Sequence, residues 1–256
     1  MGPAPPVFLT GASSGIGEAL ARHYAAAGAT LGLVARRADF LEKLRASLPG
    51  KVEVYPADVR DAAALKAAGE DFVAKHGAPR LVIANAGVSH GTLTEYADDA
   101  EVFREILDTN VVGLVNTFHP FVAPLRAARG GTLVGMASVA GFRGLPGAGA
   151  YSASKAAAIS YLEALRVELR GTGVKVLTVC PGYIATPMTA KNPYPMPFIL
   201  PAEEFARRFA RVADSGKSFA VIPWQMALVG RLLRILPNAV FDAAFARGGR
   251  KPRKNA

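Results

Sequence analysis

The sequence predicts an α/β protein in which one doubly wound parallel sheet of about seven strands carries helices on both faces. Three observations lead to this prediction. Short apolar runs alternate with longer helical stretches, which is the pattern of right-handed βαβ units. A length of 256 residues suits a single large α/β domain, and a hydrophobic content of 51% supplies its core. No internal repeat or low-complexity linker divides the chain.

The expected strands are short runs that are rich in apolar and β-branched residues. They cover residues 7–10, 30–34, 52–55, 81–83, 132–136, 174–179 and 219–222. Helical stretches follow them, the first ending near residue 27 and the others covering 38–47, 61–75, 98–126 and 150–170. Because ligands of such sheets bind beyond the carboxyl ends of the strands, we expect the chemistry in residues that directly follow a strand.

The charge of the protein is uneven. The net charge is +10, and residues 227–256 contribute +6 of it through seven basic residues and one acidic residue. The remainder is nearly balanced, and no aromatic residues interleave the basic ones of the tail in a stacking pattern. We therefore expect no nucleic-acid partner. One cysteine excludes an intramolecular disulfide, and four histidines without metal-ligand spacing predict no metal site.

A glycine-rich turn follows the first strand. Residues 10–17 read Thr-Gly-Ala-Ser-Ser-Gly-Ile-Gly and open a helix. Glycines permit a tight turn and a close approach of the backbone to a ligand, and the helix N-terminus offers free N–H groups to a phosphate. The candidate cofactor-binding residues of this turn are Gly11, Ser13, Ser14, Gly15, Ile16 and Gly17. The alternative is a strand-to-helix turn without a ligand.

Two arginines follow the second strand, where the choice between nicotinamide cofactors is made. An acid at this place binds the ribose 2′-hydroxyl of NAD, whereas an arginine accommodates the 2′-phosphate of NADP. The chain has Arg36 and Arg37 here, and its first carboxylate, Asp39, lies further on. The sequence therefore favours NADP over NAD. The alternative is that both arginines are solvated charges at a helix entry.

Tyr151 and Lys155 are four residues apart on a predicted helix and therefore share one face. A free tyrosine has a pKa of about 10, and a neighbouring ammonium group favours the phenolate. Such a tyrosine can donate a proton to a carbonyl oxygen or accept one from an alcohol. Ser138 follows the fifth strand at the same edge of the sheet, so it can bind the same substrate oxygen.

These motifs together resemble the short-chain dehydrogenase/reductase family, in its main branch of chains of about this length. The glycine turn, Asn85-Ala-Gly87, Asn110, Ser138, Tyr151-x-x-x-Lys155 and Pro181-Gly182 occur in the family's order over roughly residues 6–190. The resemblance implies a Rossmann-like dinucleotide-binding domain. The sequence also departs from the family's pattern. Ala84 replaces a frequent asparagine, and a C-terminal extension replaces the usual glycine-rich end.

The resemblance implies the following roles. Tyr151 is the general acid/base, Lys155 holds the nicotinamide ribose, Ser138 orients the substrate carbonyl, and Asn110 supports a proton-relay water. These four form the expected catalytic set. Further cofactor contacts are implied for residues that follow the third, fourth and sixth strands: Asp58, Val59, Asn85, Ala86, Gly87, Pro181, Gly182, Ile184 and Thr186.

We expect residues 1–222 to form the catalytic domain, with a substrate lid at 183–215, and residues 223–256 to form a helical extension and basic tail. Apolar lid residues such as Met188 and Tyr194 suggest a hydrophobic ketone, and simple packing of the lid is the alternative. The helix at 226–236 is too short to span a membrane. Packing on the body or on a second subunit, with a disordered tail, is favoured over contact with a membrane surface.

The sequence thus predicts an NADP(H)-dependent oxidoreductase that acts on a carbonyl compound or secondary alcohol. The alternatives are a dinucleotide-sensing protein without turnover and a lipid-type ketone reductase at a membrane surface. A homodimer through the helices at 98–126 and 150–170 is expected from the resemblance. The N-terminus lacks the basic and apolar regions of a secretory signal, so we expect a cytoplasmic protein, with surface contact to a membrane as the alternative.

Overall fold

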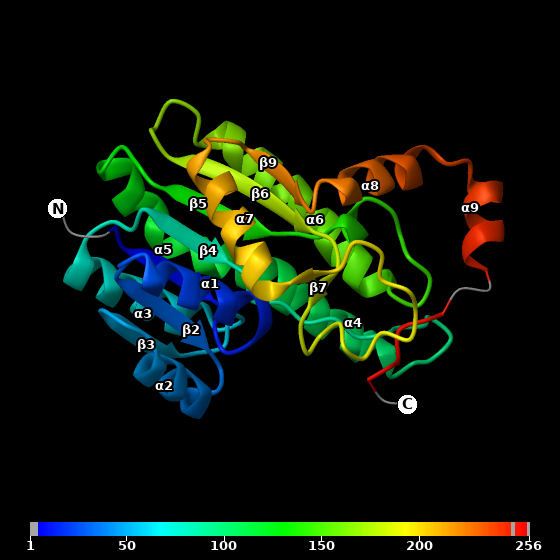
Figure 1. Cartoon of the computed structure of the whole chain (residues 1–256), viewed down its shortest axis with the longest axis horizontal. Helices are drawn as coiled ribbons and strands as arrows, with labels where there is room; N and C mark the ends of the chain where they lie inside the picture. The colour runs from blue at the N-terminus through cyan, green and yellow to red at the C-terminus, as the bar shows by residue number, and fades with distance from the viewer. Residues whose placement is uncertain (1–4, 247–248, 255–256) are drawn as a thin grey trace.

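A seven-stranded, fully parallel sheet forms the centre of the protein in the computed structural model, which describes residues 5–246 and 249–254 (Figure 1). The strand order is β3-β2-β1-β4-β5-β6-β9, so the direction of winding changes between β1 and β4. The strands are β1 Val7–Thr10, β2 Leu31–Ala35, β3 Val52–Pro56, β4 Leu81–Ala84, β5 Thr132–Met136, β6 Lys175–Pro181 and β9 Phe219–Ile222. The predicted fold class is confirmed.

Helices cover both faces of this sheet. One face carries α1 Gly15–Ala26, α2 Ala38–Ser47 and α7 Ala202–Asp214, and the other carries α3 Ala62–His76, α5 Gly113–Ala127 and α6 Gly149–Glu168. A further helix, α4 Asp99–Leu107, packs against α6. Strand side chains alternate between the two cores: Val7 and Leu9 enter the first, whereas Phe8 enters the second and packs 4.6 Å from the Phe121 ring.

Five of the elements, α7, β7, β8, η1 and η2, were not expected from the sequence. The whole of α7 lies in the segment that we expected to be a lid, and its buried Phe205 and Phe209 pack beside α1. A small second sheet joins β7 Ile184–Ala185 to β8 Leu200–Pro201 and closes the base of the remaining lid. The expected helix at 98–126 is divided by η1 Asp108–Val112, a π-helical segment, and a 3₁₀ turn, η2 Val139–Gly141, follows β5.

Two short helices follow the last strand, α8 Gln225–Ile235 and α9 Asn238–Phe245, and the proposed division at residue 222 falls between β9 and α8. Arg143 fixes them to the body. Its Nη1 donates to the Leu233 carbonyl at 2.6 Å, and its guanidinium lies 4.0 Å from the centre of the Phe241 ring. This bond satisfies a carbonyl that the end of a helix leaves without a partner. In the described part of the chain, none of the helices has the length and hydropathy required to cross a bilayer.

The tail is ordered at residues 249–254, which corrects the expectation of a disordered segment. It returns to the body beside the loop that follows β4, where Arg253 forms an isolated β-bridge with Gly91 (Figure 1). Arg253 also binds Asp99, with Nε 2.9 Å from Oδ2 and Nη2 3.1 Å from Oδ1. Part of the positive charge of the tail therefore holds the tail against the body.

Candidate active site

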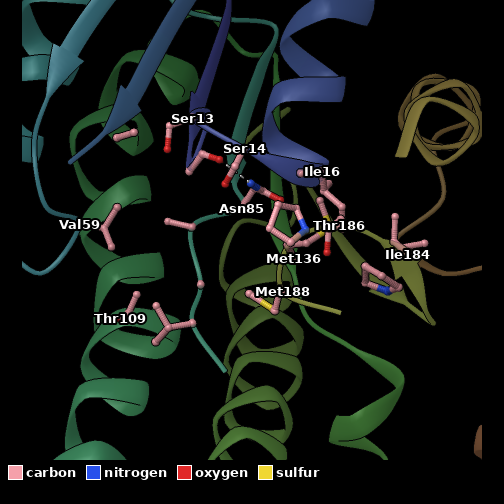
Figure 2. A pocket seen from close by; sticks show the side chains of 18 of the residues that line it. Ser13, Ser14, Ile16, Val59, Asn85, Thr109, Met136, Ile184, Thr186 and Met188 are labelled. Atoms are coloured by element: carbon pink, nitrogen blue, oxygen red, sulfur yellow. Dashed lines mark hydrogen bonds between the residues drawn. The ribbon is translucent and has the colours of Figure 1, made fainter. Parts of the chain in front are cut away.

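A cleft of about 300 Å³ opens at the carboxyl ends of the strands, where the winding direction changes (Figure 2). The turns after β1 to β6 all contribute to its wall. Twenty of the residues predicted from the sequence line it: Gly11, Ser13, Ser14, Gly15, Ile16, Arg36, Arg37, Asp58, Val59, Asn85, Ala86, Gly87, Ser138, Tyr151, Lys155, Pro181, Gly182, Ile184, Thr186 and Met188. The fold thus brings distant segments together as expected.

The glycine turn is packed tightly against the turn that follows β4. A Cβ added at Gly11 would lie 2.7 Å from the Ala86 Cα, and the φ of +71° at Gly11 also favours glycine. Asn85 ties the two turns together by donating from Nδ2 to the Thr10 and Gly11 carbonyls at 3.2 and 3.3 Å. Gly17 does not line the cleft; it lets α1 start against the Gly11 carbonyl, which a Cβ there would overlap.

The N-terminus of α1 points at the cleft with free donors. Ser14 is the N-cap residue, but its hydroxyl makes no capping bond to the helix backbone. This hydroxyl and the first N–H groups of α1 are therefore available to an anion, which the positive end of the helix dipole also favours. The arrangement fits a phosphate group.

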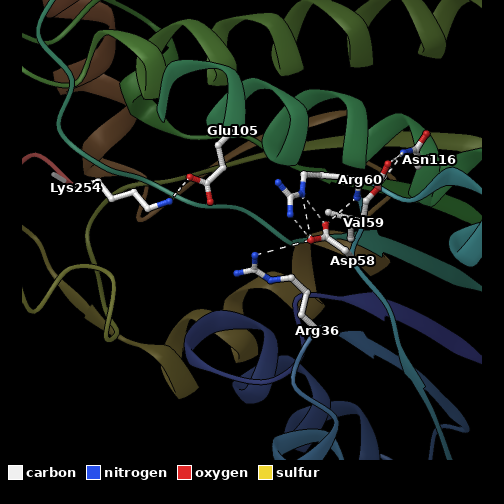
Figure 3. A network of polar contacts seen from close by, with 7 residues as sticks. All are labelled: Arg36, Asp58, Val59, Arg60, Glu105, Asn116 and Lys254. Atoms are coloured by element: carbon white, nitrogen blue, oxygen red, sulfur yellow. Dashed lines mark hydrogen bonds and ion pairs between the residues drawn. The ribbon is translucent and has the colours of Figure 1, made fainter. Parts of the chain in front are cut away.

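Charged side chains gather beside the turns after β2 and β3 (Figure 3). Arg37 Nη2 donates to the Ser13 hydroxyl at 3.1 Å, and its guanidinium lies 3.9 Å from the centre of the Phe40 ring. Asp58 pairs with Arg60 at 2.7 Å and more distantly with Arg36 at 3.9 Å. The hydrogen bond from Arg60 holds the pKa of Asp58 below its usual value. The cluster has more cationic than anionic groups.

Tyr151 and Ser138 both line the cleft. Burial raises the pKa of the Tyr151 phenol, and a hydrogen bond with Ser138 acts in the opposite direction. Ser138 stands at the N-cap of η2, where its hydroxyl accepts from the Ala140 N–H at 3.1 Å. The phenol is therefore protonated at neutral pH, which is the form that can donate a proton.

Lys155 lies one helical turn from Tyr151, with Nζ 5.7 Å from the centre of the phenol ring. The side chain is buried, and Nζ donates to the Met136 carbonyl at 2.7 Å. Burial lowers the pKa of Lys155 to about 8. We expected Lys155 to lower the pKa of Tyr151, but in this arrangement Ser138 has that effect. The reason is that the Lys155 Nζ is directed to the end of β5.

Asn110 lies outside the cleft wall, in the π-helical segment η1. Its side chain accepts from the Val88 N–H at 2.8 Å and donates to the Val88 carbonyl and the Ser154 hydroxyl, both at 3.0 Å. The two bonds with Val88 tie the loop after β4 to η1, and the bond with Ser154 ties η1 to α6. A Cβ at the neighbouring Gly87 would lie 3.1 Å from the Asn110 Oδ1 and 3.6 Å from the Lys155 Nζ, so this glycine leaves the space beside both groups open.

Several wall residues were missed, namely Ala35, Ala57, Val88, Thr109, Met136, Ala137, Pro187 and Thr189. Most are immediate neighbours of predicted ones, so strand ends could have indicated them. Thr189 is different: its hydroxyl accepts from the Thr186 N–H at 3.0 Å and donates to the Ile184 carbonyl, which shapes the start of the lid. Tyr194 does not line the cleft; its ring packs 6.4 Å from that of Tyr183.

The cleft fits a dinucleotide. Gly11 and Gly15 put bare backbone in the cleft wall, Ser14 and α1 supply donors, and Lys155 supplies a cation in the same wall. Within residues 5–246 and 249–254, no group of three His, Cys, Asp or Glu side chains is placed to hold a metal ion.

Comparison with known proteins agrees with this geometry. The family model of the short chain dehydrogenases matches residues 6–195. An uncharacterized oxidoreductase of Myxococcus xanthus is 40% identical over 94% of this chain and 96% of its own. The 3-oxoacyl-[acyl-carrier-protein] reductase of Thermotoga maritima is 35% identical over 73% and 76%.

The fold itself has a counterpart among solved structures. A short-chain dehydrogenase from Streptomyces avermitilis superposes with a TM-score of 0.79 at 24% identity, covering 95% of this chain and 98% of that one. The structural likeness shows the fold alone, whereas the family model and the sequence relatives show the family. The chain belongs to the short-chain dehydrogenases, a family of oxidoreductases that bind a nicotinamide dinucleotide.

Proposed function

We propose that the protein is an NADP(H)-dependent reductase of carbonyl compounds, with the reverse oxidation of a secondary alcohol open to the same site. The observation that carries the proposal is the meeting of the Tyr151 phenol, the Ser138 hydroxyl and the Lys155 ammonium in one cleft with an anion-binding turn. A sensing protein without turnover, the alternative, has no use for a buried proton donor at this place.

The choice of NADP rests on the charges beside β2 and β3. Arg36, Arg37 and Ser13 offer donors at the rim of the cleft. Asp58 is the carboxylate in the cleft wall, and Arg60 and Arg36 already pair with it. A ribose 2′-phosphate thus gains two guanidinium groups, whereas a ribose 2′-hydroxyl meets no unpaired carboxylate among the residues of this wall.

The chemistry at the other end of the cleft follows from proton transfer. When bound, the reduced nicotinamide supplies a hydride to the carbonyl carbon. Ser138 donates a hydrogen bond to the carbonyl oxygen and orients it toward Tyr151. Tyr151 transfers its phenolic proton to that oxygen, which completes the alcohol. Lys155 holds the ribose and stabilises the resulting phenolate, and Asn110 keeps the loop after β4 in place and supports the water through which Tyr151 regains its proton.

We propose an apolar ketone as substrate. Met188 lines the cleft, and the exposed side chains of Phe198 and Ile199 belong to the same lid. Methionine adapts to varied shapes, and such a lid suits alkyl or ring substituents on the carbonyl. Tyr194 of the same lid packs on Tyr183 and is a further proposed substrate contact.

The proposal is tested by the loss of NADPH absorbance with a panel of ketones and aldehydes, measured beside NADH. The expected result is turnover with at least one class of ketone and a preference for NADPH. Binding of NADPH without turnover of any carbonyl compound or alcohol would favour the sensing protein instead.

A second candidate, reduction of a lipid-type ketone at a membrane surface, is favoured by α8. Leu228, Leu232 and Ile235 share one exposed face of this helix, and Arg231 lies among them. Apolar and cationic groups on one helix suit an anionic bilayer surface. Full-length protein should sediment with anionic vesicles at low salt, and a variant with serine at the three apolar positions should not. Protein that ignores such vesicles contradicts this candidate.

We also propose a homodimer and a cytoplasmic location. Exposed Phe103, Val112, Val115 and Val167 lie on α4, η1, α5 and α6, the helices expected to pair, and analytical ultracentrifugation tests the pairing. Cys180 is a free, buried thiol, which suits a reducing compartment.

A further inference from the structure

The C-terminal tail, residues 249–254, is anchored beside the loop after β4, where Lys251 lies near Tyr151. Its backbone approaches Gly91 so closely that a Cβ there would overlap the Lys251 carbonyl, and the Gly91 N–H donates to the Pro252 carbonyl at 2.9 Å. On its other sides the tail meets Gly147 through Arg250 and Tyr194 through Gly249. It thus lies against the loops after β4 and β5 and against the lid.

Two of its basic side chains are neutralised by acids of α4. Arg253 pairs through two bonds with Asp99, which is 3% exposed, and its guanidinium also lies 3.6 Å from the centre of the Tyr96 ring. Lys254 pairs with Glu105 (Figure 3). The bonds of Arg253 to the buried Asp99 fix the position of the residues that precede it, whereas Lys254 follows the anchor and is partly exposed.

Lys251 is held differently. Its Nζ donates to the Ser89 hydroxyl at 2.8 Å and lies 5.9 Å from the centre of the Tyr151 ring. Lys155 is 5.7 Å from the same ring, so two ammonium groups flank the phenol. Burial lowers the pKa of Lys251 to about 8, and no carboxylate of the described residues lies within ion-pair distance of it. The cation keeps most of its charge at neutral pH.

Burying a cation without an acid partner costs free energy, because the charge loses part of its hydration. A ligand that places an anion beside the cation offsets this loss. Lys251 lies just outside the residues that line the cleft, with its ammonium 5.9 Å from the centre of the reacting phenol ring. A substituent that extends from a carbonyl bound at Tyr151 therefore needs to reach only a few ångströms beyond the cleft wall to meet it. Resting on the proposed reductase function, we propose that Lys251 binds an oxyanion group of the substrate, which makes the preferred substrate an apolar oxo acid rather than a neutral ketone.

The test compares a series of straight-chain oxocarboxylates, from acetoacetate through levulinate to longer homologues, each beside its methyl ester, and one oxosulfonate. Wild-type protein should prefer an oxyanion to its neutral counterpart. Lys251→Met should lower kcat/KM for the preferred anion by about 10–100-fold, the range of one charge-assisted hydrogen bond, and leave kcat/KM for the ester within about twofold. Comparison of the carboxylate and sulfonate arms identifies the preferred anion.

Two further variants control the result. Lys254→Met removes a charge from the same tail. Lys254 pairs with Glu105 and not with the phenol, so the variant should have the selectivity of the wild type. Arg253→Met releases the anchor, and it should reproduce the selective loss because Lys251 is no longer held near Tyr151.

Equal turnover of anions and esters by the wild type, or an equal loss for both in Lys251→Met, would overturn the proposal while leaving the reductase function intact. If no carbonyl compound turns over, the reductase function fails instead. Calorimetric titration of levulinate into wild type and Lys251→Met, both saturated with NADP, then decides the inference: weaker binding to the variant supports it, and equal or absent binding overturns it.

Discussion

Arg37 donates from Nη2 to the Ser13 hydroxyl at 3.1 Å, which joins the turn after β2 to the turn after β1. The guanidinium is also stacked 3.9 Å from the centre of the Phe40 ring, so its plane is fixed before any ligand arrives. A planar fork held in this way is suited to two hydrogen bonds with a phosphate group. This pair therefore decides the cofactor preference in our account.

Arg37→Ala should raise the KM for NADPH by about 10–100-fold, because a charge-assisted bond to the 2′-phosphate is lost. The KM for NADH should stay within about threefold, since NADH has no 2′-phosphate. The measurement is initial-rate kinetics with both cofactors. Arg45→Ala is the matched control, because Arg45 pairs with Glu42 on the outer part of α2. An equal rise of both KM values would refute the assignment.

Gly17→Ala should abolish NADPH binding and destabilise the fold. A Cβ at Gly17 would overlap the Gly11 carbonyl, so α1 or the glycine turn must move. Overpacking of this kind typically costs about 1–3 kcal/mol, which urea unfolding would detect. Gly144→Ala is the control, because a Cβ there meets nothing within 4 Å. Unchanged NADPH affinity in Gly17→Ala would show that the turn does not need this close approach.

The buried charge of Lys155 should reduce stability at neutral pH. Its pKa is lowered from 10.5 to about 8, so the unfolded chain binds more protons than the folded chain between these values, and stability from this group rises with pH there. Lys155→Met should therefore be more stable than the wild type near neutrality by up to about 3 kcal/mol. Loss of the bond to the Met136 carbonyl reduces this gain by about 1 kcal/mol.

Urea unfolding of both proteins at neutral pH and near pH 10 measures the difference, which should shrink as pH rises. Lys175→Met serves as the control because Lys175 is exposed at the start of β6. A pH-independent difference between wild type and Lys155→Met would mean that burial does not shift this group.

The sheet could be predicted because each strand is a short run of mostly apolar or β-branched residues between helical stretches. The cleft followed from the sheet, since polar residues after parallel strands must share one edge. Helix α7 was missed because three of the five residues of its buried stripe are alanines, Ala202, Ala206 and Ala210, which weaken the apolar pattern. The π-helical segment at Asn110 depends on backbone bonds that residue spacing does not reveal.

The tail could not be predicted for a different reason. Arg253 and Asp99 are 154 positions apart, and nothing local to either distinguishes a paired charge from a solvated one. Lys251 reaches Tyr151 only as a result of that pairing and of the close approach at Gly91. The apolar face of α8 was visible in the sequence, but its exposure is a property of the packed molecule.

The central claim is that the Tyr151 phenol supplies the proton in the reaction, and Tyr151→Phe tests it most directly. The variant keeps the ring and removes only the hydroxyl, so NADPH affinity, measured by titration, should be nearly unchanged. Turnover of the best ketone should fall by about 10²–10⁴-fold, the usual share of acid/base catalysis. Turnover equal to that of the wild type, with NADPH bound normally, would contradict the account.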